Sequence, residues 1–220
     1  MIQRSTTCVV GAETMRETLS SLYGEKSPPT DDGDVLFQSL PYPVLKASQV
    51  QVAKWQNSKD AKTLEGLRSV GFQLDKGPDD SGLFLKYLQR GGGYYLDVGA
   101  SQFIIDGKIK LKHGNVIEIV PTGLKLNDGQ LLEADEIIFA TGYLNMRTQT
   151  TKIFGSEIAD KVHDVWGFDA EGEIRTMWRK SGHPGLWMMG GNLALCRWYS
   201  RCLALQIKGL EEGLYRYEDI

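Results

Sequence analysis

Residues 136–143 read EIIFATGY, and this stretch decides the fold class. It joins a continuous apolar run to a Thr-Gly pair. A strand that is apolar on both faces is typical of a parallel sheet covered by helices. A glycine at the carboxyl end of such a strand lets the backbone approach a ligand closely. The stretch therefore predicts an α/β fold with Thr141 and Gly142 at a ligand-facing strand end. A routine turn after a strand is the competing interpretation.

The residues before this stretch predict a β-meander. Apolar and polar residues alternate in 108–112 and again in 116–120, which is the period of a strand with one buried face. A third short run, 123–126, is followed by Asn127-Asp128-Gly129, whose Asp-Gly pair suits a tight hairpin turn. The meander then leads into the buried strand.

The opening residues 1–10, MIQRSTTCVV, predict a strand with a polar end at residues 4–7. In a nucleotide-binding βαβ unit, the end of the second strand faces the adenosine ribose, and an arginine there accommodates the 2′-phosphate of NADP. Arg4 offers a planar guanidinium that matches phosphate, and Ser5 adds a hydroxyl donor. The competing interpretation is an ordinary surface arginine at a strand end.

Residues from about 13 to 90 are predicted to be mainly helical and irregular. Helical spacing of apolar residues over 64–70 ends at Gly71, and a second helix over 83–89 ends at a Gly-Gly-Gly run. Residues 24–34 hold two prolines and an acidic cluster, which predict a surface loop.

The last third predicts a strand, a glycine turn and a long helix. Residues 186–189, LWMM, read as a buried strand, and Gly190, Gly191 and Asn192 open a helix with an apolar face along 193–214. Asn192 suits its N-cap. Unpaired N–H groups at a helix N-terminus attract negative charge, so phosphates or a reduced flavin ring are favoured there. The alternative is a glycine turn selected only for tight packing.

Composition excludes several classes of function. The chain has 220 residues, and its 41% hydrophobic content is typical of a globular protein. Its net charge of −3 argues against a nucleic-acid partner. No apolar run reaches the roughly 20 residues of a membrane span. The three cysteines form no C-x-x-C pair, which is typical of reduced thiols in a cytoplasmic protein. The three histidines lack the spacing of metal ligands, and the hydrolase motif G-x-S-x-G is absent.

Six short segments together resemble the flavin-containing monooxygenase family, in particular its fungal-type members. They are MIQRST at 1–6, FATGY at 139–143, WGF at 166–168, HPGLW at 183–187, GGN at 190–192 and RWYSR at 197–201. The resemblance spans nearly the whole chain. Each motif is short, and their order and spacing make the resemblance fairly specific.

This resemblance implies a fold with FAD in one Rossmann domain and NADPH in a second domain inserted into it. It implies that NADPH reduces the flavin, that O2 adds at the flavin C4a position, and that the peroxyflavin oxygenates a small organic substrate. By matching position, it implies that Arg4 and Ser5 contact the NADPH 2′-phosphate. Thr141, Gly142 and Tyr143 would link the two cofactor domains, and Gly190, Gly191 and Asn192 would face the flavin. No catalytic side chain is implied.

The sequence departs from the family in lacking both G-x-G-x-x-G turns. The expected fold is therefore a partial two-dinucleotide-binding, Rossmann-like flavoprotein in a truncated chain that does not hold FAD tightly. Its expected parts are a remainder of the NADPH-binding domain (1–12), a helical insertion (13–93), the rest of the NADPH-binding domain with the β-meander (94–143), and the C-terminal part of the FAD-binding domain (144–220). The alternatives are a non-catalytic fragment or interaction remnant and an FAD/NAD(P)H reductase of the same architecture. A disulfide reductase is disfavoured because a redox-active cysteine pair is absent.

Overall fold

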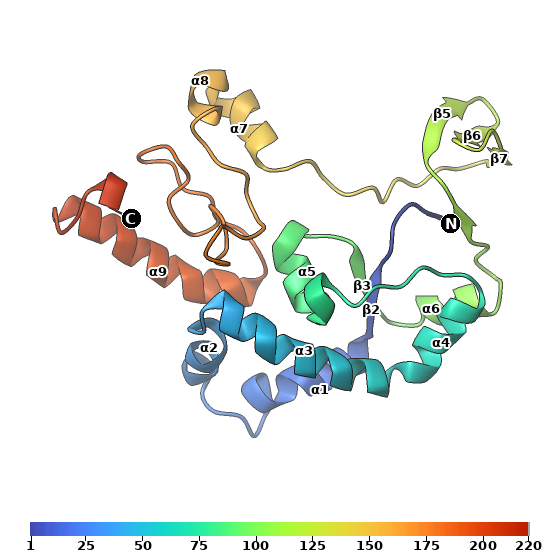
Figure 1. Ribbon diagram of the computed structural model, residues 1–220, viewed down its shortest axis with the longest axis horizontal. Coiled ribbons are helices and arrows are strands. Elements are labelled where there is room, and N and C mark those ends of the chain that lie inside the picture. Colours follow the sequence, from blue (N-terminus) through green and yellow to red (C-terminus); the bar gives the residue numbers. More distant parts are fainter. Residues whose placement is uncertain (220) are drawn as a thin grey trace. The chain divides into compact units, whose positions relative to one another are not determined.

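The computed structural model describes residues 1–219 and shows a mixed α/β protein (Figure 1). The chain divides into two compact units. Unit 1 consists of Met1–Thr18, Gln49–Tyr87 and Gly92–Gly142, and unit 2 consists of Leu19–Ser48, Leu88–Gly91 and the residues from Tyr143 on. The α/β class predicted from the sequence is confirmed. The finer prediction of cofactor-binding domains with boundaries at 13, 94 and 144 stays a prediction.

The strands of unit 1 form two small parallel sheets. Strand β1 (Ile2–Gln3) pairs with β4 (Lys112–His113), and β2 (Cys8–Gly11) pairs with β3 (Tyr94–Asp97), both in parallel. Figure 1 shows β2 beside β3, with helix α1 (Ala12–Tyr23) following β2 directly. This is the strand–helix–strand order of a βαβ unit, with further helices in the crossover.

The prediction of one continuous opening strand is wrong, because residues 4–7 separate β1 from β2. The Gln3 amide donates to the Gln73 carbonyl at 2.8 Å and accepts from the Gln73 N–H at 2.9 Å. Thr7 then donates from its backbone N–H to the same Gln73 carbonyl at 3.0 Å. These bonds to a segment 66 residues further along the sequence redirect the chain, which local propensity does not reveal.

Residues 13–93 are mainly helical, as predicted, and several of their helices lie wholly or partly in unit 1. They are α3 (Tyr42–Lys59), α4 (Ala61–Ser69) and α5 (Gly82–Arg90), with a single 3-10 turn, η1 (Pro78–Asp80), and α6 (Ala100–Ile105) after β3. The predicted stop after α4 is confirmed, since Gly71 has φ 87°. The left-handed region costs glycine almost nothing, so a glycine there ends a helix.

The core of unit 1 lies between its helices and β2. It consists of buried residues from β2, α4, the segment after α4, and α6: Val9, Leu64, Leu67, Phe72 and Ile104. A Cβ atom at position 66 would lie 2.7 Å from the Ile105 Cδ1, so any larger residue in α4 would require the Ile105 side chain of α6 to shift.

The predicted β-meander is confirmed. Strands β5 (Val116–Val120), β6 (Gly123–Leu126) and β7 (Leu131–Glu133) form an antiparallel sheet. Gly129, with φ 83°, donates to the Leu126 carbonyl at 2.9 Å in the expected hairpin turn. The strand predicted over 108–112 is wrong except for its last residue, which begins β4.

The buried strand predicted over 136–143 is absent from the structure. These residues form no strand, and most are exposed; Ile138 is 90% exposed. A strand that is apolar on both faces needs a neighbouring strand on each side and a covering layer. No strand within residues 1–219 pairs with this segment, so its apolar side chains stay in contact with solvent.

Unit 2 is helical and irregular. It contains α2 (Thr30–Gln38), α7 (Arg147–Phe154), α8 (Ser156–Ala159), α9 (Leu193–Glu211) and a 3-10 turn, η2 (Tyr217–Asp219). The loop predicted over 24–34 is therefore wrong from Thr30 on. The buried strand predicted over 186–189 is wrong too, because only isolated bridges, Met177 to Met188 and Lys180 to Trp187, form there.

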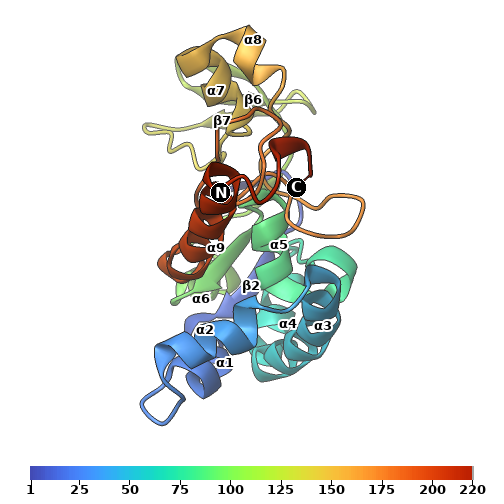
Figure 2. The ribbon, with the colours of Figure 1, turned by 90° about the vertical axis from the view of Figure 1, so that its left-hand side faces the viewer.

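An ion pair joins α2 to α9, which lie side by side in both views (Figures 1 and 2). The Arg197 Nε and Nη2 atoms donate to the two oxygens of Asp34, each at 2.6 Å, and the Tyr23 hydroxyl donates to the same carboxylate at 3.0 Å. Burial and this hydrogen bond to a carboxylate raise the pKa of Tyr23 to about 12. The hydroxyl therefore keeps its proton and stays a donor at neutral pH.

The buried face of α9 differs from the predicted one. Leu195, Leu203 and Gly209 are buried, whereas Leu193 and Leu214, which the apolar spacing places on the core face, are exposed. At 3.6 residues per turn the three buried residues share one side of α9, and Arg197 reaches Asp34 from the opposite, more exposed side. The predicted N-cap is confirmed, since the Asn192 Oδ1 accepts from the Leu195 N–H at 2.9 Å.

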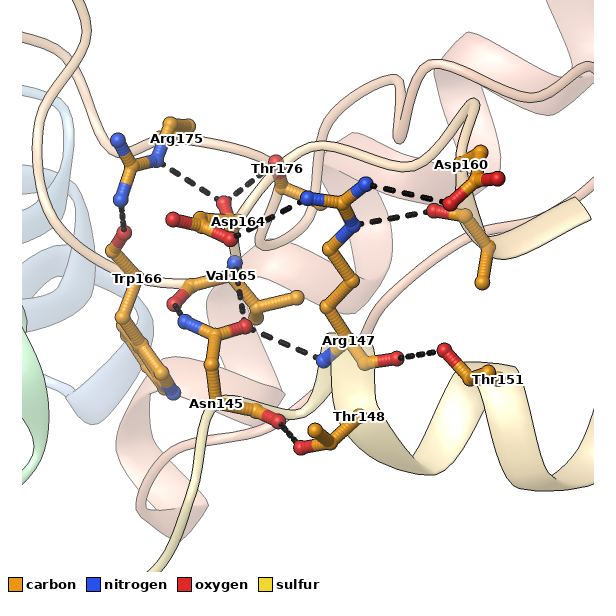
Figure 3. A network of polar contacts seen from close by, with 11 residues as sticks. Asn145, Arg147, Thr148, Thr151, Asp160, Asp164, Val165, Trp166, Arg175 and Thr176 are labelled. Atoms are coloured by element: carbon orange, nitrogen blue, oxygen red, sulfur yellow. Dashed lines mark hydrogen bonds and ion pairs between the residues drawn. The ribbon is translucent and has the colours of Figure 1, made fainter. Parts of the chain in front are cut away.

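Side-chain hydrogen bonds hold the irregular segment between α8 and α9 in place of a sheet. Figure 3 shows the Asn145 amide donating to the Val165 carbonyl at 2.8 Å and accepting from the Val165 N–H at 3.1 Å. Arg175 donates to the Asp164 and Trp166 carbonyls at 3.0 and 2.9 Å. This network fixes the segment that leads into residues 173–179. Within residues 1–219, no helix is both long and apolar enough to cross a membrane.

Candidate functional site

Arg4 and Ser5 lie directly after the carboxyl end of β1, in unit 1, and both are exposed. Within residues 1–219 the Arg4 guanidinium has no ion pair and no hydrogen bond. The carboxyl ends of parallel strands are where α/β proteins place ligand contacts. Arg4 therefore follows a strand end, as predicted. The strand is the two-residue β1 and not the predicted strand over residues 1–10.

Thr141, Gly142 and Tyr143 are exposed, at the boundary between the two units. Gly142 has φ 79°, and a Cβ atom built there would meet nothing within 4 Å. Glycine is thus favoured at this position by the backbone conformation and not by close packing. The predicted role of these three residues as a link between cofactor domains stays a prediction.

Gly190, Gly191 and Asn192 precede α9 in unit 2, as predicted. The Gly190 carbonyl accepts from the Trp178 indole at 3.0 Å, and a Cβ atom at Gly190 would lie 3.3 Å from the Met177 Cε. This contact favours tight packing as the reason for glycine at 190. Gly191 is exposed and has φ 108°.

The amino end of α1, at the carboxyl end of β2, is bound to a carboxylate that sequence reasoning missed. The Gly11 N–H donates to the Asp60 Oδ2 at 2.7 Å, and the Thr14 hydroxyl donates to the Asp60 Oδ1 at 2.6 Å. Negative charge is stabilised at a helix N-terminus, so Asp60 takes the place that an anionic ligand would occupy. The only sequence signal at Asp60 is its location just before α4, which suggests an N-cap of that helix.

Replacing Asp60 with alanine is expected to lower the free energy of unfolding by about 1–3 kcal/mol, because the Gly11 N–H and the Thr14 hydroxyl lose their acceptor. Asp60→Asn keeps one acceptor oxygen and is expected to lose less. Urea denaturation followed by circular dichroism measures both. Glu65→Ala, which alters an exposed residue of α4, is the control. Equal effects of Asp60→Ala and Glu65→Ala would contradict this role.

A hollow of about 450 Å³ lies wholly within unit 2. Residues of the α2–α3 connection (38–42), of the irregular segment (173–179) and of α9 line it. Its size is within the range of small-molecule sites in proteins. Two of its α9 residues, Trp198 and Tyr199, belong to the RWYSR motif, and the third, Cys202, directly follows it. This motif is the sequence signal that points to the hollow.

Polar groups of the hollow are connected by hydrogen bonds. The Tyr42 and Tyr199 hydroxyls are 2.7 Å apart, and the Tyr199 hydroxyl donates to the Gln38 backbone carbonyl at 3.5 Å. Burial raises the pKa of Tyr199, so its hydroxyl stays protonated at neutral pH. The Glu173 Oε1 accepts from the Tyr42 N–H at 3.0 Å.

One wall of the hollow is built on strained backbone. Thr176 and Trp178 have φ angles of 65° and 63°, in the left-handed region that non-glycine residues rarely adopt. Each such residue costs about 1–3 kcal/mol and persists only where the surroundings hold it. Here the Thr176 hydroxyl donates to the Asp164 carbonyl at 2.9 Å, and the Trp178 ring stacks on the Tyr199 ring at a centroid distance of 6.4 Å. Such outliers gather at binding and catalytic sites.

Comparison with known proteins adds no relative to this picture. No model of a known protein family matches the sequence, and the comparison with curated proteins finds no match.

Proposed function

We propose that the chain forms part of an NADPH- and FAD-dependent monooxygenase that inserts one oxygen atom from O2 into a small organic substrate. Two observations support the proposal. The six motifs occur in the order and spacing of the flavin-containing monooxygenase family that the chain resembles. The observation that carries the proposal is that Arg4 follows the carboxyl end of a parallel strand, exposed and without an internal partner.

The chain's own residues would supply recognition of the nucleotide 2′-phosphate. The Arg4 guanidinium matches a phosphate with two parallel N–H donors, and the Ser5 hydroxyl beside it is a third donor. In this class of enzyme, the flavin reduced by NADPH supplies the chemistry that activates O2. We assign no catalytic side chain.

The two places that would meet cofactor phosphates or the flavin do not fit them as they stand. The amino end of α1 already binds the Asp60 carboxylate. The Gly190 carbonyl accepts from Trp178, and the backbone of Gly190 packs on Met177. We therefore limit the proposal for these residues to NADPH recognition at Arg4 and Ser5, and we expect the purified chain to hold no FAD.

The discriminating measurement compares NADPH with NADH, which lacks the 2′-phosphate. We expect NADPH to bind about tenfold more tightly than NADH, because one arginine–phosphate pair contributes about 1.4 kcal/mol or more. In Arg4→Ala this preference is expected to disappear. The readout is the fluorescence of the reduced nicotinamide during titration with protein.

Arg68→Ala is the matched control, because Arg68 is an exposed arginine of α4 in the same unit. It is expected to keep the preference for NADPH. Equal affinities for the two nucleotides in the unaltered chain, or a preference that survives Arg4→Ala, would reject the assignment.

A non-catalytic role is the second candidate, and the exposure of the apolar residues in 136–143 favours it. The two candidates differ in the nucleotide titration, because only the enzyme predicts a preference for NADPH that disappears in Arg4→Ala. Yellow protein that retains FAD after gel filtration and oxidises NADPH would support the enzyme and contradict both the non-catalytic role and our expectation of a chain without FAD.

A further inference from the structure

We propose that the hollow in unit 2 binds a small organic cation that carries N–H donors, with the cation between Glu173 and Gln38 and its apolar body against the aromatic residues. This inference does not rest on the proposed function, because it involves neither Arg4 nor a nucleotide. Four properties of the hollow support the proposal. Each of them concerns residues within 1–219.

The first property is a buried acceptor without a partner. The Gln38 side chain lines the hollow and is 6% exposed as a residue, and its Oε1 atom accepts no hydrogen bond from any described residue. A buried carbonyl oxygen left in this way costs about 1–3 kcal/mol, and native proteins rarely leave one. A ligand that donates a hydrogen bond to Gln38 would recover this cost.

The second property is an unpaired negative charge. Glu173 lines the same hollow, and no lysine, arginine or histidine within residues 1–219 forms an ion pair with it. The nearby cation, Arg179, already pairs with Asp169 at 2.9 Å and donates to the Ile174 carbonyl at 3.4 Å. The Glu173 carboxylate is therefore available to a ligand. Its negative charge favours a ligand that carries a positive charge.

The third property is that the two tyrosine hydroxyls of the hollow already have acceptors. The Tyr199 hydroxyl donates to the Gln38 carbonyl, so the hydrogen of the Tyr42 hydroxyl bonds to Tyr199. The Gln38 Oε1 and the Glu173 carboxylate remain as acceptors, and the Glu173 charge disfavours an anionic ligand beside it. Two acceptors favour a group with at least two N–H donors, such as an amidinium or a primary ammonium.

The fourth property is the aromatic lining. Tyr42, Trp198 and Tyr199 are among the residues that line the hollow. Aromatic faces attract cations and bury the apolar part of a ligand. The strained Thr176–Trp178 wall beside them holds Tyr199 in position by ring stacking.

Titration of the full chain with benzamidine tests the proposal, followed by chemical-shift changes in heteronuclear NMR spectra. Benzyl alcohol, which has the ring but neither the charge nor two donors, is the comparison ligand. We expect benzamidinium to bind about tenfold more tightly than benzyl alcohol. We also expect its affinity to fall about tenfold in Glu173→Gln, which removes the charge but keeps an acceptor for the Tyr42 N–H.

Glu171→Gln is the matched control, because Glu171 lies two residues away, is exposed and does not line the hollow. Gln38→Met removes the unpartnered oxygen and is expected to weaken binding. Gln38→Glu adds a second negative charge and is expected to strengthen it, a gain that a purely structural role of Gln38 would not produce.

Three outcomes would overturn the proposal. They are no shift changes with benzamidine up to about 10 mM, equal affinity for benzyl alcohol, and equal loss in Glu173→Gln and Glu171→Gln. Thermal unfolding of each variant shows whether it is folded at the temperature of the titration.

Discussion

Replacing Arg197 with methionine is expected to destabilise unit 2 by about 3–5 kcal/mol, because it leaves the Asp34 carboxylate buried without its counter-charge. The Asp34 side chain is 1% exposed, whereas that of Arg197 is 37% exposed. Asp34→Asn leaves an arginine that water still reaches, so it is expected to cost less, about 1–2 kcal/mol. Urea denaturation and hydrogen exchange of the α9 amides measure both losses.

The exposed pair in the next turn of α9 provides the control. Arg201 and Asp31 are 3.1 Å apart, and both side chains are mostly in solvent. Exposed pairs contribute little, so Arg201→Met is expected to change the stability by less than about 1 kcal/mol. Similar losses in Arg197→Met and Arg201→Met would show that α9 is not held by the buried carboxylate.

The same ion pair predicts a dependence on pH. The hydrogen bond from Arg197 is the largest cause that lowers the pKa of Asp34. A lowered pKa in the folded state adds stability above the unfolded-state value of about 3.9, and this stability is lost as the pH falls through the folded-state value. The difference in stability between the unaltered chain and Arg197→Met should therefore shrink below about pH 4. A constant difference from pH 7 to pH 3 would argue against this assignment.

The second large effect is expected for Leu67→Ala in the core of unit 1. Leu67 is 0% exposed and lies among Val9, Leu64, Phe72 and Ile104. Truncating a buried leucine to alanine removes apolar contacts and leaves a cavity, with a loss of about 2–5 kcal/mol.

Leu96→Ala is the control for this core prediction, because Leu96 belongs to β3 in the same unit and is exposed. It is expected to cost less than about 1 kcal/mol. Thermal unfolding followed by circular dichroism compares the two variants. A loss for Leu67→Ala no greater than that for Leu96→Ala would mean that α4 and α6 do not share the core described above.

Features that depend on neighbouring residues alone are the ones the sequence predicted well. Asn192 caps α9, Gly71 ends α4, and the Asp128-Gly129 turn closes the hairpin of the meander. Each depends on a left-handed backbone or on a hydrogen bond within a few residues, so the local sequence contains the whole cause.

The candidate site was predicted only in part, because its residues come together from distant segments. Arg4 was identified because a strand end and a guanidinium are both visible in the sequence. Gln38 and Glu173 carry no motif and become neighbours of one hollow only through the packing of α9. Asp60 is similar, since its bonds to Gly11 and Thr14 span more than 45 residues.

The sequence by itself determined the α/β class, the helices predicted over 64–70, 83–89 and 193–214, the meander and the family that the chain resembles, because spacing and turn residues act locally. The tertiary structure decided where the opening strand breaks, which face of α9 is buried, and that residues 136–143 stay exposed. The physical reason is the same in each case. Gln73 redirects the first strand, packing around Leu195 and Leu203 buries one face of α9, and an apolar strand without pairing partners has no sheet to enter.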